Sequence, residues 1–212
     1  MIKPHYWDDA TRHLAAGDPV LAALIAASPG LHLTRRGDPF TTLARAIVGQ
    51  QISVKAAQSI WERLVDACGN AGPPPTLDPA RARRKRVATL RAVGLSQRKA
   101  EYIRDLAQHF VSARLDPRTW PALDDEALIE ALVDVKGIGR WTAEMFLMFH
   151  EMRADVLPVD DLGLQKAIAL HYFNGERPTL PILRAFGEKW RPYRSVATWY
   201  LWRSLDPVPV EY

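Results

Sequence analysis

The 212-residue chain has one cysteine, Cys68, and no apolar run that approaches the length of a membrane-spanning helix. A single cysteine excludes an internal disulfide framework and an iron–sulfur cluster held by four cysteines, and it favours a reduced thiol in an intracellular protein. The six histidines show neither H-x-x-x-H nor Cys/His spacing, so we expect no zinc site. Residues 1–18 lack the apolar core of a secretory signal. No Walker loop or dinucleotide fingerprint occurs.

What the chain does contain is typical of an ordinary globular protein, with 48% hydrophobic and 25% charged residues. Its net charge of +4 is compatible with nucleic acid but does not identify it. The clustering is more informative, because the basic run RARRKR at residues 81–86 is followed by Arg91, Arg98, Lys99 and Arg104. A run of basic residues is usually a solvent-exposed face of a helix. The basic run is therefore either such a face or a surface that binds nucleic acid.

Apolar residues recur at helical spacing through most of the chain, which predicts an all-α fold. Ser96 and Asp124 are placed as N-caps, and Gly94 and Gly137 as turn residues. Residues 31–34 are the one candidate strand, and the Pro-rich segment 72–79 cannot be helical throughout. The expected helices are Phe40–Val48, Ser53–Cys68, Ala80–Val93, Gln97–Ala113, Asp124–Val135, Arg140–Met152, Asp161–Phe173 and Thr179–Leu205.

The most informative feature is a Gly137-Ile138-Gly139 turn between two helical patterns. Two residues without a Cβ let the backbone approach a ligand and adopt positive φ, and the following helix begins with unpaired N–H groups. A DNA phosphate fits such a helix start without a base-specific contact. Lys136 and Arg140 add positive charge on either side. A similar turn at Gly94 lacks the second glycine, and we interpret it as an ordinary helical hairpin.

Asp160 and Asp161 follow the turn at the start of the next predicted helix. One interpretation is that both only cap this helix. The other is that one caps while its neighbour points into a pocket, where a carboxylate can stabilise a developing cation or orient water.

Five blocks in order resemble the helix-hairpin-helix DNA glycosylases, in particular the DNA-3-methyladenine glycosylase II branch. The segment LVDVKGIGRWTAEMFLMF resembles their hairpin, and ADVLPVDDLGLQKAI resembles the segment that carries their catalytic aspartate. The other three blocks are GQQISVKAA, GLSQRKAEYI and WRPYRSVATWYLW. The similarity extends from about residue 40 to residue 205, and it is greatest to compact members that lack an N-terminal β-rich domain.

The resemblance implies a two-lobed helical fold with the active site between the lobes. Residues 1–212 are expected to form one glycosylase unit, with a helical lobe at 35–125 and a hairpin-containing lobe made of 1–34 and 126–212. Asp161 is implied as the catalytic carboxylate. Glycosylases of this fold that also cleave the DNA backbone carry a lysine where this chain has Trp141, and tryptophan cannot form a Schiff base. The resemblance therefore implies a monofunctional enzyme.

The resemblance also assigns a base pocket, an intercalating loop and a cation site. Trp141, Met145 and Trp202 are implied to line the pocket, with Met145 in place of an expected aromatic residue; packing in the core is the alternative for each. Gln50 or Gln51 is implied to fill the space of the flipped base, although both could be polar turn residues. A structural Na⁺ or K⁺ is expected on backbone carbonyls, implied at Val133, Val135 and Ile138.

Together these expectations describe a glycosylase that excises alkylated purines such as 3-methyladenine and 7-methylguanine from double-stranded DNA. No required cofactor, no iron–sulfur cluster and no membrane partner are expected. A monomer is expected, acting at the cytoplasmic nucleoid in a bacterium or in the nucleus of a eukaryote. Two alternatives stay open. One is a glycosylase of the same fold for deaminated or oxidised bases, and the other is a non-catalytic DNA-binding module that keeps only the hairpin.

Overall fold

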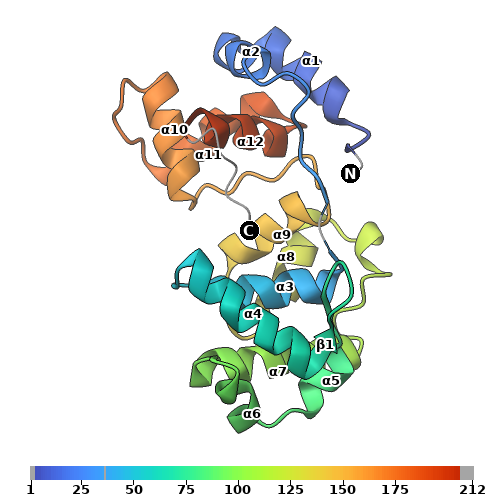
Figure 1. The fold of residues 1–212 in the computed structure, drawn as a ribbon. Helices are drawn as coiled ribbons and strands as arrows, with labels where there is room; N and C mark the ends of the chain where they lie inside the picture. Colours follow the sequence, from blue (N-terminus) through green and yellow to red (C-terminus); the bar gives the residue numbers. More distant parts are fainter. Residues whose placement is uncertain (1–2, 36, 206–212) are drawn as a thin grey trace. The chain divides into compact units, whose positions relative to one another are not determined.

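The structure is a computed structural model, which describes residues 3–35 and 37–205. Nearly all regular structure in these ranges is helical, which confirms the all-α prediction (Figure 1). The described residues form only two strands, β1 (Gly69–Asn70) and β2 (Thr76–Leu77), which pair antiparallel. The contacts divide the chain into a central unit, residues 37–146, and a terminal unit, residues 3–35 and 147–205.

The central unit is organised around α7, whose residues Ile103, Leu106 and Ala107 are fully buried. This helix packs against α3, α5 and α6. The helices of the unit are α3 (Pro39–Gly49), α4 (Val54–Cys68), α5 (Pro79–Arg84), α6 (Val87–Ala92), α7 (Gln97–Val111), the 3-10 helix η1 (Trp120–Ala122), α8 (Asp125–Val133) and the first part of α9 (Arg140–Phe149).

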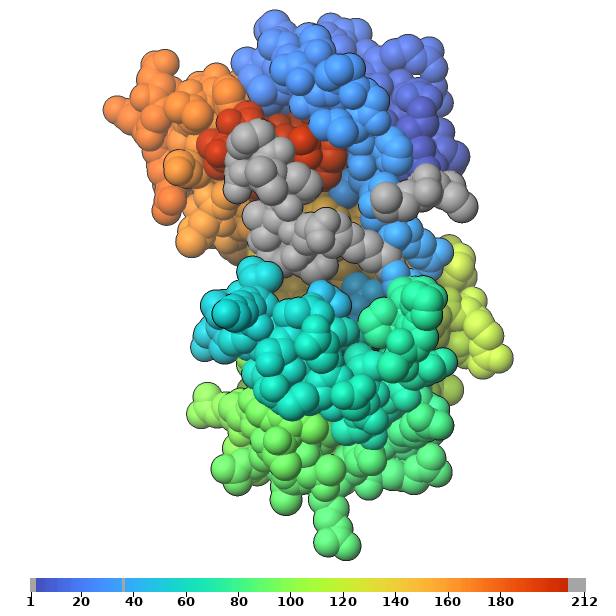
Figure 2. All heavy atoms as spheres, viewed as in Figure 1, coloured from blue at the N-terminus to red at the C-terminus, as the bar shows by residue number. Residues whose placement is uncertain are grey.

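A line of edge-to-face aromatic rings connects the ends of the central unit. Phe40 packs on Phe110, Phe110 on Trp120 and Trp120 on Phe146, with ring centroids 5.3, 6.2 and 5.5 Å apart. These contacts join α3, α7, η1 and α9 through burial of large apolar surfaces. On the face seen in Figure 2, α4 covers most of α3, against which it packs.

The terminal unit is organised around α12, on which every residue from Ser195 to Leu201 is buried. This helix packs against α1, α2 and α10, and the ring of Trp199 meets that of Trp7 edge-on at 5.2 Å. The helices of the unit are α1 (Trp7–Gly17), α2 (Pro19–Ala26), the last turn of α9, α10 (Leu162–Tyr172), α11 (Leu180–Gly187), η2 (Glu188–Trp190) and α12 (Arg194–Leu205).

A buried carboxylate, that of Asp18, connects three segments of the terminal unit. Its Oδ1 caps α2 by accepting the N–H groups of Val20 and Leu21 at 3.0 and 3.2 Å. Its Oδ2 accepts the Trp190 indole N–H at 3.0 Å and the Tyr172 hydroxyl at 2.9 Å, and lies 2.9 Å from Lys189 Nζ. A charge this deeply buried is stable only when it is paired and hydrogen-bonded, as Asp18 is.

Several expected elements differ from the observed ones. The expected helix Thr179–Leu205 is interrupted between α11 and α12 because Pro192 has no N–H and its ring clashes inside a helix. The helix expected over Ala80–Val93 is two helices, since Lys85 and Arg86 are extended. Residues 31–34 form no strand. Helices α1 and α2 are additions that the sequence interpretation missed.

The division of the chain also differs from the expected lobes at one boundary. The contacts divide the chain near residue 35 and after Phe146, whereas the lobes that the resemblance implies meet at residues 34 and 35 and at residues 125 and 126. The reason is that the hairpin is fastened to α7 of the central unit, where the Lys136 N–H donates to Asp105 Oδ2 at 2.9 Å.

Across residues 3–35 and 37–205, no helix is long and apolar enough to cross a membrane.

Candidate active site

The predicted hairpin is present, with α8 and α9 joined through residues 134–139. Ile138, between the two glycines of the turn, is buried, with 3% of its surface exposed. Gly137 has φ +86°, and a Cβ there would lie 2.2 Å from Cδ2 of the Tyr102 ring. Gly137 is therefore required by the turn and by close packing on α7. Gly139 does not share the positive φ expected for both glycines, and a Cβ there would meet nothing within 4 Å.

Two side chains from α7 and one from the loop between α3 and α4 hold the hairpin loop in place. Asp105 accepts the Lys136 N–H, and the buried His109 ring approaches Asp134 Oδ2 at 3.1 Å through Nε2. Gln50 donates from Nε2 to the carbonyl oxygen of Gly137 at 2.9 Å. The backbone of the turn is thus fixed before any ligand arrives, which lowers the entropy cost of binding at the start of α9.

The side chain of Arg140 has a different role from the expected one. Its Nη1 and Nη2 donate to the two carboxylate oxygens of Glu126 at 2.5 and 2.7 Å, and its Nε donates to Glu144 at 3.0 Å. The hydrogen bonds to Glu126 are the main cause that raises the pKa of Arg140. Because two carboxylates compensate this charge, Arg140 joins the starts of α8 and α9. The exposed Lys136 is the cation of the pair that a phosphate can reach.

The two glutamines of the loop between α3 and α4 lie in different environments. Gln50 is half-buried through its bond to the hairpin, whereas Gln51 is exposed and has φ +57°, which non-glycine residues rarely adopt. The apolar Val54 beside them is 83% exposed. Of the two glutamines, Gln51 is therefore the one available to enter a duplex.

Lys99 supports this loop from α7. Its Nζ donates to the carbonyl oxygens of Val48 and Gln50 at 2.8 and 2.6 Å. These carbonyls lie at the C-terminal end of α3, where the helix dipole favours a cation. Burial lowers the pKa of the Lys99 ammonium. The residue fixes the backbone on which Gln51 stands.

In the terminal unit, Asp161 and Trp202 are in direct contact. Oδ1 of Asp161 accepts the indole N–H of Trp202 at 2.7 Å and the Leu164 N–H at 2.7 Å. The second bond makes Asp161 the N-cap of α10, whereas Asp160 is exposed. The expectation that one aspartate caps while its neighbour enters a pocket is therefore incorrect, because the capping residue is the candidate catalytic one.

Two further residues shape the surroundings of Asp161. The ring of Phe149 stacks on Trp202 with centroids 5.9 Å apart and an angle of 11° between the planes. A Cβ at Gly163 would lie 3.0 Å from Asp161 Oδ1 and 3.2 Å from Trp202 Cδ1. Glycine at this position therefore permits the close contact between the carboxylate and the indole.

The remaining pocket candidates lie four residues apart on α9, and so share one face of that helix. Trp141 is half-buried, and Met145 is 7% exposed. The burial of Met145 is typical of a core residue, which is the alternative interpretation of this position. The ring of Trp141, by contrast, is partly accessible.

The proposed cation ligands are backbone oxygens of the hairpin. The Val135 carbonyl already accepts the Ile138 N–H at 3.1 Å, and a carbonyl oxygen has a second lone pair for an ion. Hard oxygen donors of this type suit alkali ions rather than transition metals. In the part of the chain that the structure describes, no three His, Cys, Asp or Glu side chains form a group that could hold a metal ion.

Sequence reasoning assigned no role to Lys99, Asp105 or Gly163. Lys99 and Gly163 lie inside blocks that carry the resemblance. The residues that Lys99 bonds, and the Trp202 ring beside Gly163, lie far away in sequence, so the sequence did not indicate these contacts. A lysine inside an amphipathic helix also looks like any solvated cation until the elements opposite it are known.

The comparisons with known proteins agree with this architecture. Residues 44–192 match the HhH-GPD superfamily of base excision DNA repair proteins, and the chain belongs to this superfamily. Within it, the chain is 35% identical to DNA-3-methyladenine glycosylase 1 of Schizosaccharomyces pombe, over 79% of this chain and 72% of that protein. It is 32% identical to DNA-3-methyladenine glycosylase 2 of Escherichia coli, over 90% of this chain and 66% of that protein.

Solved structures lead to the same branch. A DNA-3-methyladenine glycosidase from Bacillus halodurans has a TM-score of 0.83 and 38% identity, covering 93% of this chain and 89% of that one. A 3-methyladenine DNA glycosylase of Schizosaccharomyces pombe in complex with abasic DNA has a TM-score of 0.78 and 30% identity, covering 92% of this chain and 96% of that one.

Proposed function

We propose that this protein is a monofunctional DNA glycosylase that hydrolyses the N-glycosidic bond of alkylated purines and leaves an abasic site. The contact between Asp161 and Trp202 is the observation that carries this proposal, because it fixes a carboxylate beside an aromatic surface. Breaking the glycosidic bond leaves cationic character on the deoxyribose, which a fixed carboxylate stabilises as it develops. The same carboxylate can orient or deprotonate the attacking water.

Docking of the DNA is assigned to the hairpin. The N–H groups at the start of α9 lack partners within the helix and carry the positive end of its dipole, so they suit a phosphate. Gly139 leaves this approach open, since nothing lies within 4 Å of the place of a Cβ. A Na⁺ or K⁺ on the carbonyls of Val133, Val135 and Ile138 would add positive charge beneath the same phosphate.

Base extrusion is assigned to the loop between α3 and α4. An enzyme that acts on a base within a duplex must unstack it, and a side chain that fills the vacated space lowers the cost. Gln51 is exposed there, on a backbone that Lys99 and Gln50 hold. Its amide can hydrogen-bond to the base left without a partner.

The aromatic surfaces indicate the class of base. Alkylation at N3 of adenine or N7 of guanine makes the base cationic, so it leaves readily and interacts favourably with an aromatic face. Trp141 in the central unit, and Trp202 and Phe149 in the terminal unit, are the candidates for such faces. Met145, a flexible side chain, lies one helical turn after Trp141 on α9. We expect a protein that acts as a monomer on double-stranded DNA, in the nucleoid of a bacterium or the nucleus of a eukaryote.

The test is a single-turnover base-release assay on duplexes with defined lesions, read by chromatography of the freed bases. We expect 3-methyladenine and 7-methylguanine to be released faster than hypoxanthine, uracil or 8-oxoguanine. Faster release of hypoxanthine, uracil or 8-oxoguanine would instead support a glycosylase for deaminated or oxidised bases. If no base is released, the remaining interpretation is a non-catalytic DNA-binding module.

A second test is borohydride trapping of a covalent protein–DNA adduct. No adduct should be trapped, because Trp141 has no amine that could form a Schiff base; a trapped adduct would overturn the monofunctional mechanism.

A further inference from the structure

The central unit has an open surface depression of about 480 Å³ beside the hairpin. We call it the basic depression. Seven polar side chains line it: Arg83, Arg84, Glu101, Arg104, Asp105, Gln108 and Lys136. Every lining side chain ends in a charged or polar group, whereas pockets for small molecules are lined mostly by hydrophobic and aromatic residues.

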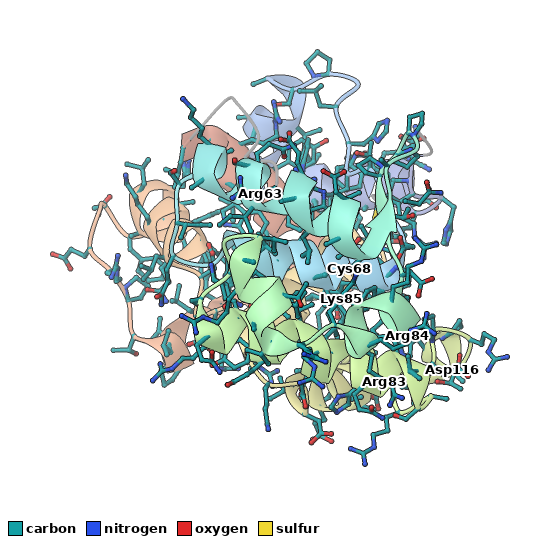
Figure 3. The ribbon with its side chains drawn as sticks, turned by 60° about the horizontal axis from the view of Figure 1, so that its bottom comes forward. Arg63, Cys68, Arg83, Arg84, Lys85 and Asp116 are labelled. Atoms are coloured by element: carbon teal, nitrogen blue, oxygen red, sulfur yellow. The ribbon has the colours of Figure 1, made fainter. Side chains whose placement is uncertain are left out.

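Three elements contribute to the basic depression. Arg83 and Arg84 end α5, which packs against α7. On α7, the lining residues from Glu101 to Gln108 recur at three- and four-residue spacing along one face. Lys136 comes from the hairpin itself. Figure 3 views the central unit from the side of α5, α6 and α7 and labels Arg83 and Arg84.

In the basic depression the two carboxylates accept hydrogen bonds from neighbouring groups, whereas the four cations are not paired with carboxylates of the described residues. Asp105 accepts the Lys136 N–H, and Glu101 accepts the amide of Gln97 at 2.5 Å. Arg83 donates one N–H to the neutral Gln108 at 2.8 Å. Among residues 3–35 and 37–205, no carboxylate oxygen lies within 4.0 Å of a side-chain nitrogen of Arg83, Arg84, Arg104 or Lys136, in contrast to Arg140. Four exposed cations therefore face two carboxylates there.

We propose that the basic depression is a second docking surface for the phosphate backbone of duplex DNA, continuous with the hairpin through Lys136. The proposal rests on the proposed function and extends it beyond the lesion. Arginine forks bind phosphate oxygens bidentately, and contacts to phosphate carry no sequence information. Continuity with the hairpin favours DNA over an acidic protein, because one backbone can cross both sites.

The test compares a triple variant, Arg83→Gln, Arg84→Gln and Arg104→Gln, with a control of equal charge change in the terminal unit, Arg12→Gln, Arg177→Gln and Arg184→Gln. Binding to undamaged duplexes of about one and about three helical turns is titrated over a range of salt concentrations. For the longer duplex, the slope of log K against log[salt] should become shallower by about 0.9 for each phosphate that the variant no longer neutralises. The control should keep the slope of the unaltered protein.

Single-turnover base release at saturating enzyme should be unchanged in the triple variant, because none of its three arginines is assigned to the chemistry. An unchanged slope with intact folding, or an equal change in the control, would overturn the proposal. Unchanged DNA binding together with abolished binding to polyglutamate would also overturn it, in favour of an acidic protein partner. Because binding is measured on undamaged DNA, absence of base release with a reduced slope would count against the proposed function alone.

Discussion

The amide of Gln50 donates a hydrogen bond of 2.9 Å to the carbonyl oxygen of Gly137, 87 residues away in sequence. This bond connects the loop assigned to base extrusion with the hairpin assigned to phosphate docking. Gln51, the next residue, makes no such connection and is exposed in a left-handed conformation. Two adjacent residues of the same type therefore lie in different environments, and the proposed function gives them separate roles, one within the protein and one toward the DNA.

Substitution of each glutamine by alanine tests this separation. Gln50→Ala should lower the free energy of unfolding by about 1 kcal/mol, the typical contribution of one hydrogen bond. Gln51→Ala should leave stability unchanged and slow base release. The slowing should be greater for a correctly paired lesion than for a mismatched one, because a mismatched base costs less to unstack. Urea denaturation and single-turnover release provide the two measurements, and equal slowing on both substrates would contradict the assignment.

Asp161→Asn should reduce base release at least about a hundredfold, since the charge beside the developing cation is removed. Stability should change by less than about 0.5 kcal/mol, because asparagine caps helices as well as aspartate does. Asp160→Asn is the matched control and should release bases at the normal rate. Binding to undamaged DNA should be retained in both variants. Near-normal release by the Asp161 variant would remove this residue from the mechanism.

Gly163→Ala should separate activity from stability in the same region. The added Cβ would lie 3.0 Å from Asp161 Oδ1 and 3.2 Å from the Trp202 ring, so one of the two must move. We expect base release to fall about tenfold or more, as small displacements of catalytic groups are costly. Stability should not fall, since alanine favours a helix by about 1 kcal/mol. Gly17→Ala, whose Cβ would meet nothing within 4 Å, is the control and should retain activity.

Gly139→Asp should stabilise the free protein while weakening its DNA complex. The carbonyl of Gly139 accepts the Ala143 N–H at 3.0 Å, so residue 139 lies where an N-cap aspartate is favourable. The new carboxylate would occupy the place of the phosphate and repel it. Damaged and undamaged duplexes should lose affinity equally, and Gly139→Ala separates the effect of the β-carbon from that of the charge. Unchanged affinity for plain DNA would exclude the hairpin as the docking element.

Asp18→Asn should lower the free energy of unfolding by about 2 kcal/mol near neutral pH, because hydrogen bonds to a charged group are removed. Burial alone would raise the pKa of Asp18, but hydrogen bonds from Trp190, Lys189, Leu21 and Tyr172 lower it overall. A lowered pKa stabilises the fold above the pKa of the unfolded chain, and this stability is lost as pH falls through the folded value. The difference between the two proteins should therefore shrink below about pH 4. Asp9→Asn, at an exposed ion pair with Arg12, should change little at any pH.

Local features of the sequence predicted local structure well. Ser96 and Asp124 cap α7 and α8 through the N–H groups of Lys99 and Ala127, as their residue type and position indicated. Gly94 and Gly137 have the positive φ that helix-ending turns require. These outcomes depend on a few consecutive residues, so the chemistry of those residues is sufficient to predict them.

Partner choice between distant segments could not be predicted in the same way. Arg140 is expected to meet a phosphate when only its neighbours are considered, but hairpin closure brings Glu126 to it. Lys99 is one of several cations near the basic run, and only the fold places the end of α3 above it. Asp161 was chosen by resemblance, while its contact with Trp202 depends on how α10 and α12 pack.

Asp161 begins α10 with the same oxygen that the indole of Trp202 contacts. Asparagine, serine and threonine can also begin a helix, so each could replace the aspartate with little damage to the architecture. Under the proposed mechanism, a single substitution at position 161 would therefore abolish base release while the folded protein persists. Overall likeness of fold would not distinguish such a protein from an active one, whereas the residue at position 161 would.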